Sequence, residues 1–451
     1  MTLRAGAAEA VITPPVGTLM DGYSGREGGA IGVHDDLHAR ALVVDDGDTS
    51  AALVSADLIG VDRRLVASVR ERASAATGIP AANILVAATH THCGPAGLRR
   101  ELDEALTEIM ARTIAGAIQA AHRELRPAVL KAGRGSVDSV SQNRRDPDGP
   151  FDDALRVLLF DSPDPRDGVI ASIVNFACHP TVLYRTNMLV SADYPGHAIR
   201  TVRNVLGDAP VLFFNGACGD VNPSWIEQRH DEAQRVGSIV GSEAARRLQE
   251  LRPLGQQHKV WSIRWDELTD KPVTSGRLIE NPRIRAASVD VPAPLRRLPP
   301  PAWYDEQLAE LEARRVALAP DDREGMRPVM EMVTRYRTER LVAERLRGGS
   351  GVHYVHCEVQ AISFGEGCVL LGLPGEFFVE TGRAIQEAAG LPDLLVAGYA
   401  NHYLGYVVPR HAFEAGGYEA GVTVVDETAE ETFRAAAIDL LRQATTGSSS
   451  A

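Results

Sequence analysis

Two histidines directly follow a short apolar run in the segment ILVAATHTHCGP, residues 84–95. Side chains alternate along a strand, so His90 and His92 are expected on one side and able to address a single point. A lone His-x-His pair is a weak signal, because two histidines at a strand end are more often simply hydrogen-bonded there. The pair indicates a site only if other groups of suitable type converge on it.

Three other segments also place polar residues just after an apolar run. His179 ends NFACHPTVL (175–183), where Pro180 favours an extended histidine. A Gly-rich turn that contains Asn222 ends PVLFFNGACGDVNP (210–223), and Glu376 follows the apolar run at 368–373. Ligands of open α/β sheets bind at the carboxyl ends of strands, so we expect these segments to converge. Two histidines, one carboxylate and an open position for water form a recurrent catalytic zinc site.

Glu376 also allows a simpler interpretation. It lies in GLPGEFFVETG (372–382), just before a predicted helix, where the helix dipole stabilises a carboxylate. Taken alone, that structural role is the more common one. The residues by themselves do not decide between a metal ligand and a carboxylate at a helix N-terminus.

The elements that must position these residues follow from hydrophobic periodicity. Apolar runs alternate with amphipathic segments, which predicts a layered α/β domain with a large mixed, partly parallel sheet flanked by helices. Strands are predicted at 51–57, 83–88, 154–161, 169–178, 210–215 and 368–373, and helices at 61–76, 101–122, 230–251 and 427–443.

The domain organisation is predicted to be simple. We expect one domain over 1–445, since strand patterns resume after an atypical segment at about 266–350. That segment contains the Pro-rich VDVPAPLRRLPPPAW and then charged helical patterns, and it is expected to be a mostly helical insertion that packs beside the site. Residues 446–451 are predicted to form a disordered tail.

Composition excludes several classes of function. The chain has 451 residues and a net charge of -13, with 60 acidic and 47 basic side chains, which disfavours nucleic-acid binding. No stretch reaches the roughly 18 apolar residues of a membrane span, so no integral membrane association is expected. The N-terminal segment lacks the basic and apolar regions of a secretory signal, which predicts a cytoplasmic location. The cysteines are odd in number and scattered, which favours reduced thiols over disulfides.

The motifs together resemble those of a known family. ATHTHCGP, FACHPT, NGACGDVNP, LPGEF and YVVPRHAFEAGGYEAG occur in the order found in the neutral/alkaline (non-lysosomal) ceramidases. Members of that family are zinc-dependent amidases that cleave the N-acyl bond of ceramide. The resemblance extends from AEAVITPPVG near the N-terminus to the tyrosine motif, and five ordered motifs are far more specific than any one of them.

The resemblance implies a site and a cofactor. The cofactor is Zn²⁺, and its implied ligands are His90, His179, Glu376 and Tyr406. His92 and Tyr418 are implied beside the open position. The Asn-Arg of SQNRR resembles a motif whose arginine lies near the substrate, which points to Arg144, although Arg145 is adjacent.

The implied chemistry agrees with the residue types. Zinc makes a bound hydroxide available near neutral pH. Tyr406 as a ligand would be a phenolate, which needs a strong local cation. His92 is expected to carry protons as general acid and base, and Tyr418 to hydrogen-bond the developing oxyanion. Either tyrosine could instead be a core aromatic residue, but their Gly-rich, polar segment argues against packing as the sole reason.

Two departures from the family change the expected substrate. The family carries a catalytic serine at the position of Asn222, and an amide can donate a hydrogen bond but cannot act as a nucleophile or proton carrier. Ser224 is a possible substitute two residues later. The chain also ends soon after the tyrosine motif, so no C-terminal immunoglobulin-like domain of the kind in full ceramidases is expected. Both features lead us to expect a smaller soluble substrate than ceramide.

Three functions therefore remain at this stage. The favoured one is a zinc-dependent amidohydrolase that cleaves a small soluble N-acyl substrate with a metal-activated water. The second is a zinc-dependent acyltransferase or cyclase on the same scaffold. The third is a catalytically inactive zinc-binding homologue that lost activity with the serine.

Overall fold

The elements predicted from periodicity form in the computed structural model, which describes residues 2–23, 26–98, 102–253, 259–261, 268–270, 276–318, 323–346 and 354–446. Local sequence signals fix their ends. Asp62 caps helix α1 (Arg63–Thr77) by accepting a hydrogen bond from the Arg64 amide, and Gly78 ends it in a left-handed conformation. Asp103 caps α2 (Glu104–Arg123) in the same way.

The first sheet contains the βαβ unit expected near the N-terminus. Its strand order is β5-β4-β3-β1-β6. The strands are β1 (Arg4–Val11), β3 (His38–Asp45), β4 (Ser50–Ala56), β5 (Ile84–Ala88) and β6 (Arg126–Pro127). Strands β4 and β5 are parallel and are joined by α1. Helix α2 covers β1 and β3.

The second sheet repeats this arrangement later in the chain, with the order β12-β10-β9-β7-β16. Its strands are β7 (Val129–Ser136), β9 (Ala154–Asp161), β10 (Val169–Phe176), β12 (Val211–Asn215) and β16 (Arg277–Ile279). Strands β10 and β12 are parallel and are connected through α3 (Asp193–Leu206). Helix α4 (His230–Leu251) packs on α3, β7 and β9.

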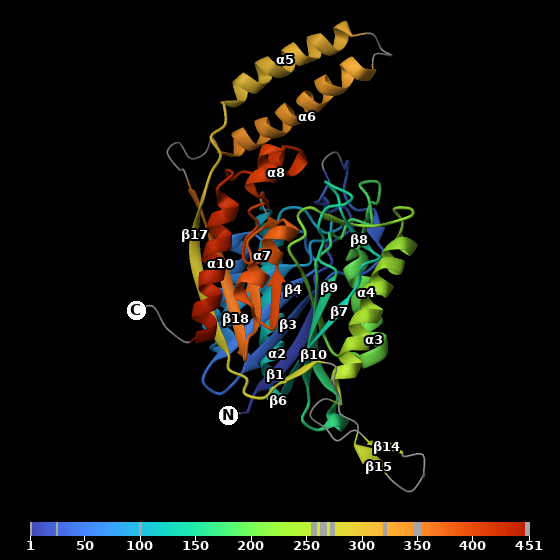
Figure 1. Ribbon diagram of the computed structural model, residues 1–451, viewed down its shortest axis with the longest axis vertical. Coiled ribbons are helices and arrows are strands. Elements are labelled where there is room, and N and C mark those ends of the chain that lie inside the picture. The colour runs from blue at the N-terminus through green and yellow to red at the C-terminus, as the bar shows by residue number, and fades with distance from the viewer. Residues whose placement is uncertain are drawn as a thin grey trace.

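A third sheet has the order β17-β18-β19-β21. It consists of β17 (Arg285–Pro294), β18 (Tyr354–Gly365), β19 (Cys368–Gly372) and β21 (Asp393–Ala397). The parallel strands β19 and β21 are connected through α7 (Val379–Ala389), and α10 (Ala429–Thr446) covers β17 and β18. Figure 1 shows α3 and α4 along one side of the sheets and α10 along the opposite side. The mixed, partly parallel α/β architecture is thus confirmed, with the strands distributed over several sheets.

One apolar core joins the three sheets. It contains Leu53 of β4, Phe214 of β12 and Leu370 of β19, all fully buried. Neighbouring residues of the same strands, such as Val54, face the opposite way into the core beneath the helices. Burying each such side chain contributes about 1.5–3 kcal/mol. Because both faces of these strands are buried, the segments that follow their carboxyl ends are held in fixed positions.

Short elements lie in the connections between these sheets. They are β2 (Gly32–Val33), η1 (Ala81–Asn83), β8 (Ser141–Asn143), η2 (Pro165–Asp167), β11 (Leu189–Val190), β13 (Val221–Pro223), β14 (Lys259–Trp261), β15 (Leu268–Asp270), β20 (Glu376–Phe377), β22 (Tyr406–Val407), α8 (Arg410–Glu414) and α9 (Tyr418–Val422). Several of them carry residues of the predicted site.

No helix among the described residues is long and apolar enough to cross a membrane. The five cysteines are buried and form no disulfide.

The segment at 266–350 differs from the predicted helical insertion. Its helical part is a hairpin of α5 (Pro301–Ala317) and α6 (Arg323–Leu346), which projects at the top of Figure 1. Before the hairpin, β16 and β17 are strands of the main sheets, so the prediction was wrong for this part. The prolines of VDVPAP misled the assignment, but β17 pairs with β18 at the edge of its sheet, where proline is tolerated. Of the predicted tail, Thr446 ends α10 and 447–451 lie outside the described residues.

Candidate metal centre and active site

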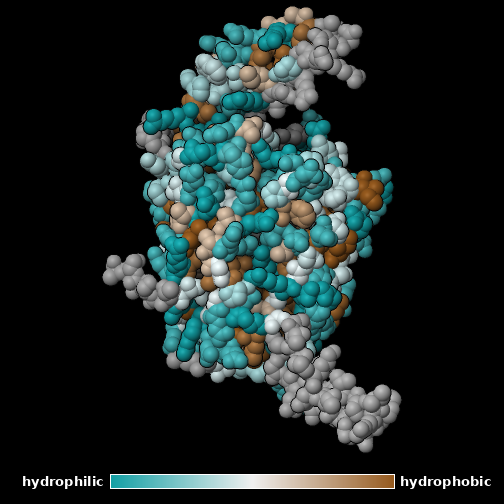
Figure 2. Space-filling view, viewed as in Figure 1, coloured by the Kyte–Doolittle hydropathy of each residue, from teal (hydrophilic) through white to brown (hydrophobic). Residues whose placement is uncertain are grey.

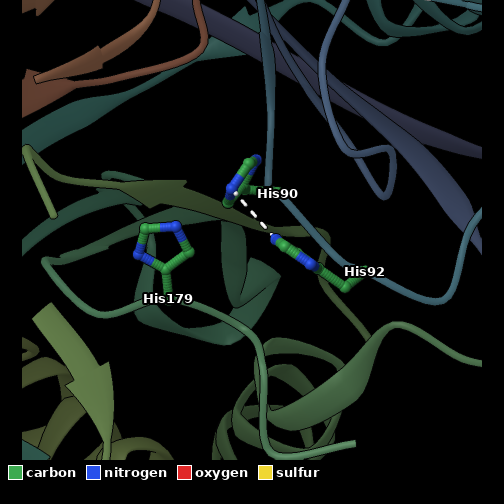
Figure 3. Close-up of side chains that lie close together, drawn as sticks. All are labelled: His90, His92 and His179. Atoms are coloured by element: carbon green, nitrogen blue, oxygen red, sulfur yellow. Dashed lines mark hydrogen bonds between the residues drawn. The ribbon is translucent and has the colours of Figure 1, made fainter. Parts of the chain in front are cut away.

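Three histidines and one glutamate lie together after the carboxyl ends of β5, β10 and β19. Ligand atoms of His90, His92 and His179 all lie within 4.8 Å of one another, and all three residues are buried. Figure 3 shows their imidazoles around a common space, with the Nε2 atoms of His90 and His92 3.2 Å apart. Glu376 Oε2 lies 3.1 Å from His179 Nε2 and 3.4 Å from His90 Nε2. Four of the predicted site residues therefore form one cluster.

The two histidines of the first motif converge for a different reason from the one predicted. Strand β5 ends at Ala88, and His90 has a left-handed backbone with φ of 74°. Its amide donates to the Leu58 carbonyl, which fixes the turn. Strand alternation was therefore the wrong argument for this pair. A strained turn that tertiary contacts hold in place brings the rings together.

Hydrogen bonds to backbone carbonyls orient two of the imidazoles. His90 Nδ1 lies 2.6 Å from the Ile59 carbonyl oxygen, and His179 Nδ1 lies 2.6 Å from the Cys218 carbonyl oxygen. A carbonyl can only accept, so each Nδ1 carries the hydrogen and each Nε2 presents a lone pair. Burial lowers the pKa of His179 to about 4, more than Glu376 raises it, so this ring is neutral near pH 7. The same orientation is found in metal-binding histidines.

Glu376 completes a set of electron-pair donors. Burial raises the pKa of Glu376, whereas positive charge at His90 and His179 lowers it well below its usual range. With the hydrogens of both rings on Nδ1, that positive charge has to come from a cation between the rings and the carboxylate. The Tyr403 hydroxyl donates to the other oxygen of Glu376. Oε2 therefore faces two Nε2 lone pairs at short range, an arrangement that a cation would stabilise.

The alternative role of Glu376 at a helix N-terminus is not what the structure shows. Helix α7 begins at Val379, and the Val379 amide donates to the Asp220 carboxylate at 2.8 Å. Asp220 comes from the Gly-rich turn after β12, so that turn supplies the carboxylate at the helix end. Glu376 is left to face the histidines.

Arg144 lies on the other side of the site and joins three of its residues. Its guanidinium donates to the Tyr406 hydroxyl at 3.0 Å, to Asn222 Oδ1 at 3.3 Å and to the Glu419 carboxylate at 2.8 Å. Arg145 also donates to Glu419, at 2.5 Å, and its other hydrogen bonds are donated to the Ala412 and Gly416 carbonyls. The structure thereby distinguishes the two arginines that the sequence left open.

The two predicted tyrosines have different surroundings. Tyr406 is buried and is the register partner of Glu376 in the parallel β20–β22 pair. Burial raises the pKa of Tyr406 well above its usual value, although Arg144 acts in the opposite direction. A phenolate at Tyr406 thus requires a further cation. Tyr418 is 62% exposed, with its ring centre 5.9 Å from that of Tyr406, so it is not a core residue.

Asn222 lies at the margin of the site. It is half-buried in β13 and pairs across to Gln142 of β8. Its contact with Arg144 is long for a hydrogen bond to a charged donor. Ser224, the proposed substitute for the family serine, is exposed in the loop that follows β13.

Several residues that shape the site were missed from the sequence. Glu419 is buried between the two arginines, Tyr399 stacks on His90 with ring centres 3.9 Å apart, and Tyr23 lies against His92 at 5.0 Å. Glu419 adjoins Tyr418 in the tyrosine motif, which was a usable signal. The contacts of Tyr23 and Tyr399 join distant parts of the chain, so spacing alone could not reveal them.

Comparison with known proteins identifies the family. The family model described as "Neutral/alkaline non-lysosomal ceramidase, N-terminal" matches residues 3–235, about half of the chain. The chain therefore belongs to the neutral/alkaline non-lysosomal ceramidase family, as its motifs predicted.

Curated relatives and solved structures agree with this assignment. The neutral ceramidase of Pseudomonas aeruginosa is 24% identical over 507 residues, covering 97% of this chain and 71% of the relative. The Mycobacterium tuberculosis neutral ceramidase is 24% identical over 466 residues, covering 90% and 71%. The crystal structure of the Pseudomonas aeruginosa enzyme superimposes with a TM-score of 0.71 at 21% identity, covering 98% of this chain and 74% of that one. A structure of ceramidase complexed with C2 gives 0.72 at 21% identity, covering 100% and 77%. The structural likeness confirms the fold.

Proposed function

We propose that the protein is a zinc-dependent amidohydrolase that cleaves the N-acyl bond of an amide substrate. One observation carries the proposal: the Nε2 lone pairs of His90 and His179 and the carboxylate of Glu376 face one another, while both Nδ1 hydrogens are committed to backbone carbonyls. Its relatives named as ceramidases act on an amide, which supports the same reaction class. The expectation of a small soluble substrate stays a prediction.

The residues present fit a zinc ion. His90, His179 and Glu376 offer the nitrogen and carboxylate donors that zinc prefers, and Tyr406 is the proposed fourth ligand. His92 also lies within ligand distance of the other histidines, so its assignment needs its own test. When bound, zinc supplies a Lewis acid for the amide carbonyl and lowers the pKa of a bound water to roughly 7.

The chain's own residues carry the remaining steps. His92 accepts a proton at Nε2 from the attacking water and returns it to the leaving amine. The Tyr23 ring packs against His92, and Arg26 donates to the His92 carbonyl at 2.9 Å, which limits movement of the imidazole. Arg144 and Tyr418 donate hydrogen bonds to the carbonyl oxygen as it gains negative charge.

Metal analysis and product analysis on the purified protein test this proposal. We expect about one zinc per chain, hydrolysis of N-acyl amides, loss of activity after chelation and its recovery when zinc is restored. Parallel reactions with added amines separate hydrolysis from acyl transfer, because transfer would give a new amide in place of the free acid. A zinc-loaded protein inert towards a broad panel of soluble and lipid amides would refute the proposal and favour an inactive homologue.

A further inference from the structure

A row of tyrosine and arginine side chains borders His92. The centre of the Tyr23 ring lies 5.0 Å from that of His92, and the centre of the Tyr184 ring lies 5.5 Å from that of Tyr23. The Arg26 guanidinium lies over the Tyr23 ring at 5.1 Å. The Arg185 guanidinium lies over the Tyr184 ring at 5.4 Å, within the roughly 6 Å reach of a cation–π contact. The row therefore begins at the proposed proton carrier and ends at Arg185.

Hydrogen bonds join the three loops that supply this row. Tyr23 lies between β1 and β2, and its hydroxyl donates at 2.8 Å to the Leu183 carbonyl, which lies between β10 and β11. Arg26 donates to the His92 carbonyl at 2.9 Å and to the Asp21 carbonyl at 2.8 Å. These bonds hold the row in a fixed position relative to the His92 imidazole.

Arg185 is a surface cation at the outer end of the row. Tyr184 is 38% exposed, and Arg185 is also exposed. Within the part of the chain that the structure describes, the Arg185 guanidinium has no hydrogen bond or ion pair, unlike the two arginines that share Glu419. The carboxyl of Asp193 lies near Tyr23, but it is buried and its two oxygens accept from backbone amides. The positive charge of Arg185 is therefore available to a ligand.

The proposed reaction places one half of the substrate along this row. His92 returns a proton to the leaving amine, so the nitrogen of the scissile bond must come within hydrogen-bond reach of the His92 imidazole. The carbonyl oxygen lies on the other side, where Arg144 and Tyr418 donate to it. Groups attached to the nitrogen therefore border Tyr23 and extend towards Arg185.

An anionic substrate of this protein needs a local cation. The chain has a net charge of -13, so its field as a whole repels anions. Figure 2 shows polar side chains over most of the face in view, so it is the position beside His92, and not its charge alone, that distinguishes Arg185. The planar guanidinium can donate two parallel hydrogen bonds to one carboxylate, and stacking on Tyr184 limits the directions in which it points.

We infer that Arg185 binds a carboxylate on the amine half of the substrate, so that the protein prefers N-acyl amino acids to amides of neutral amino alcohols. The inference rests on the proposed function, because it places the carboxylate beside the same reaction. One guanidinium matches the single charge of a carboxylate. Arg185 is thus a specificity-determining residue and takes no part in bond cleavage.

Kinetics with matched amides test the inference. N-hexanoyl amides of glycine, 4-aminobutanoate and 6-aminohexanoate carry the carboxylate at increasing distance, and each is compared with the amide of the amino alcohol of equal length. We expect a higher kcat/KM for the carboxylate at one or more lengths, with the difference carried by KM. Arg185→Gln should reduce this preference about tenfold, as expected for the loss of a hydrogen bond to a charged group. Arg185→Lys should keep most of it.

Arg126→Gln is the matched control for the change in net charge. Arg126 is an exposed arginine of β6, which pairs with the first residues of β1. Its replacement should leave the preference for carboxylates unchanged. Equal kcat/KM values for all the paired amides in the parent protein, or the same loss of preference in Arg126→Gln and Arg185→Gln, would overturn the inference even if amides are hydrolysed.

Binding of uncleaved probes separates this inference from the proposed hydrolysis. N-dansyl derivatives of the same amino acids and amino alcohols are sulfonamides, which an amidase does not cleave, and fluorescence anisotropy gives their affinities for the full chain. We expect the acids to bind more tightly than the alcohols, and this difference to shrink in Arg185→Gln and at high salt. That pattern without any turnover would keep the Arg185 site and refute the proposed hydrolysis. Turnover without that pattern would overturn the assignment of Arg185.

Discussion

The candidate metal centre and the arginine–tyrosine side of the site are held in place in different ways. In the centre, His90 and His179 are almost fully buried, and backbone carbonyls fix both rings. On the other side, Arg144 and Tyr406 are positioned by side-chain hydrogen bonds, and Tyr418 is largely exposed. Backbone carbonyls move only with the fold, whereas side-chain networks can adjust one residue at a time.

This difference suits the two tasks. A metal site needs ligands whose protons and directions are set before the metal arrives, which backbone partners provide. The side of the site that meets the substrate must let a ligand enter and leave. It therefore needs exposed side chains as well as a few that are held rigidly. Substitutions in the centre should therefore remove the metal, while substitutions on the other side should change rate or stability with the metal retained.

The largest effect is expected from removing a histidine of the centre. His90→Ala and His179→Ala should each lose zinc, because each deletes a donor whose lone pair faces Glu376. Activity should fall by more than the 10- to 100-fold typical of losing an outer partner of a metal ligand. Elemental analysis of the purified variants measures the metal, with the parent protein as control. Full zinc occupancy in both variants would contradict the assigned centre.

His92→Ala tests whether His92 carries protons or binds the metal. We expect a decrease in rate of about 10²- to 10⁴-fold with zinc retained, since general acid–base groups typically contribute that much. Rate measurements paired with zinc analysis decide the role of this residue. Zinc loss in His92→Ala would instead make His92 a ligand, which its short distance to His90 permits.

Glu419→Gln should affect stability as well as rate. Glu419 is the shared carboxylate of Arg144 and Arg145, and breaking such a buried pair typically lowers the free energy of unfolding by about 3–5 kcal/mol. Arg144 would also lose its fixed direction towards Tyr406, and a small misplacement of this kind can reduce the rate up to about 10²-fold. Denaturant unfolding measures the loss of stability and kinetics the loss of rate. Zinc analysis checks that the metal is retained.

The matched control for that variant is Glu414→Gln, which changes an exposed carboxylate in the same segment. It should leave the free energy of unfolding, the rate and the zinc content unchanged. Unaltered stability in Glu419→Gln would show that the arginines do not depend on this carboxylate.

The smallest effect is expected at Asn222. Asn222→Ala removes one long hydrogen bond from Arg144, a contribution of roughly 1 kcal/mol, so kcat/KM should decrease about 10-fold or less. Asn222→Ser should stay close to the parent protein, because a hydroxyl can also accept from Arg144. A covalent acyl-enzyme trapped in the parent protein would contradict direct attack by water.

Much of the fold could be predicted because the signals are local. Strand β9 and helix α4 have the predicted bounds, since apolar runs and helical periodicity are properties of neighbouring residues. The segment around β17 was mispredicted because its prolines resemble a loop, and only pairing with β18 makes it a strand. The single-domain organisation stays a prediction.

The sequence by itself determined the family and the positions of the candidate ligands. Histidine, glutamate and tyrosine stand in ordered motifs next to apolar runs, and both features can be read without knowing the fold. The sequence could not decide between Arg144 and Arg145, because adjacent side chains differ only in the partners that folding brings to them.

The tertiary structure alone decided the proton positions. The carbonyls that orient the two imidazoles come from Ile59, 31 positions from His90, and from Cys218, 39 positions from His179. Hydrogen-bond direction depends on which distant segments meet, and residue types and spacing do not specify those meetings.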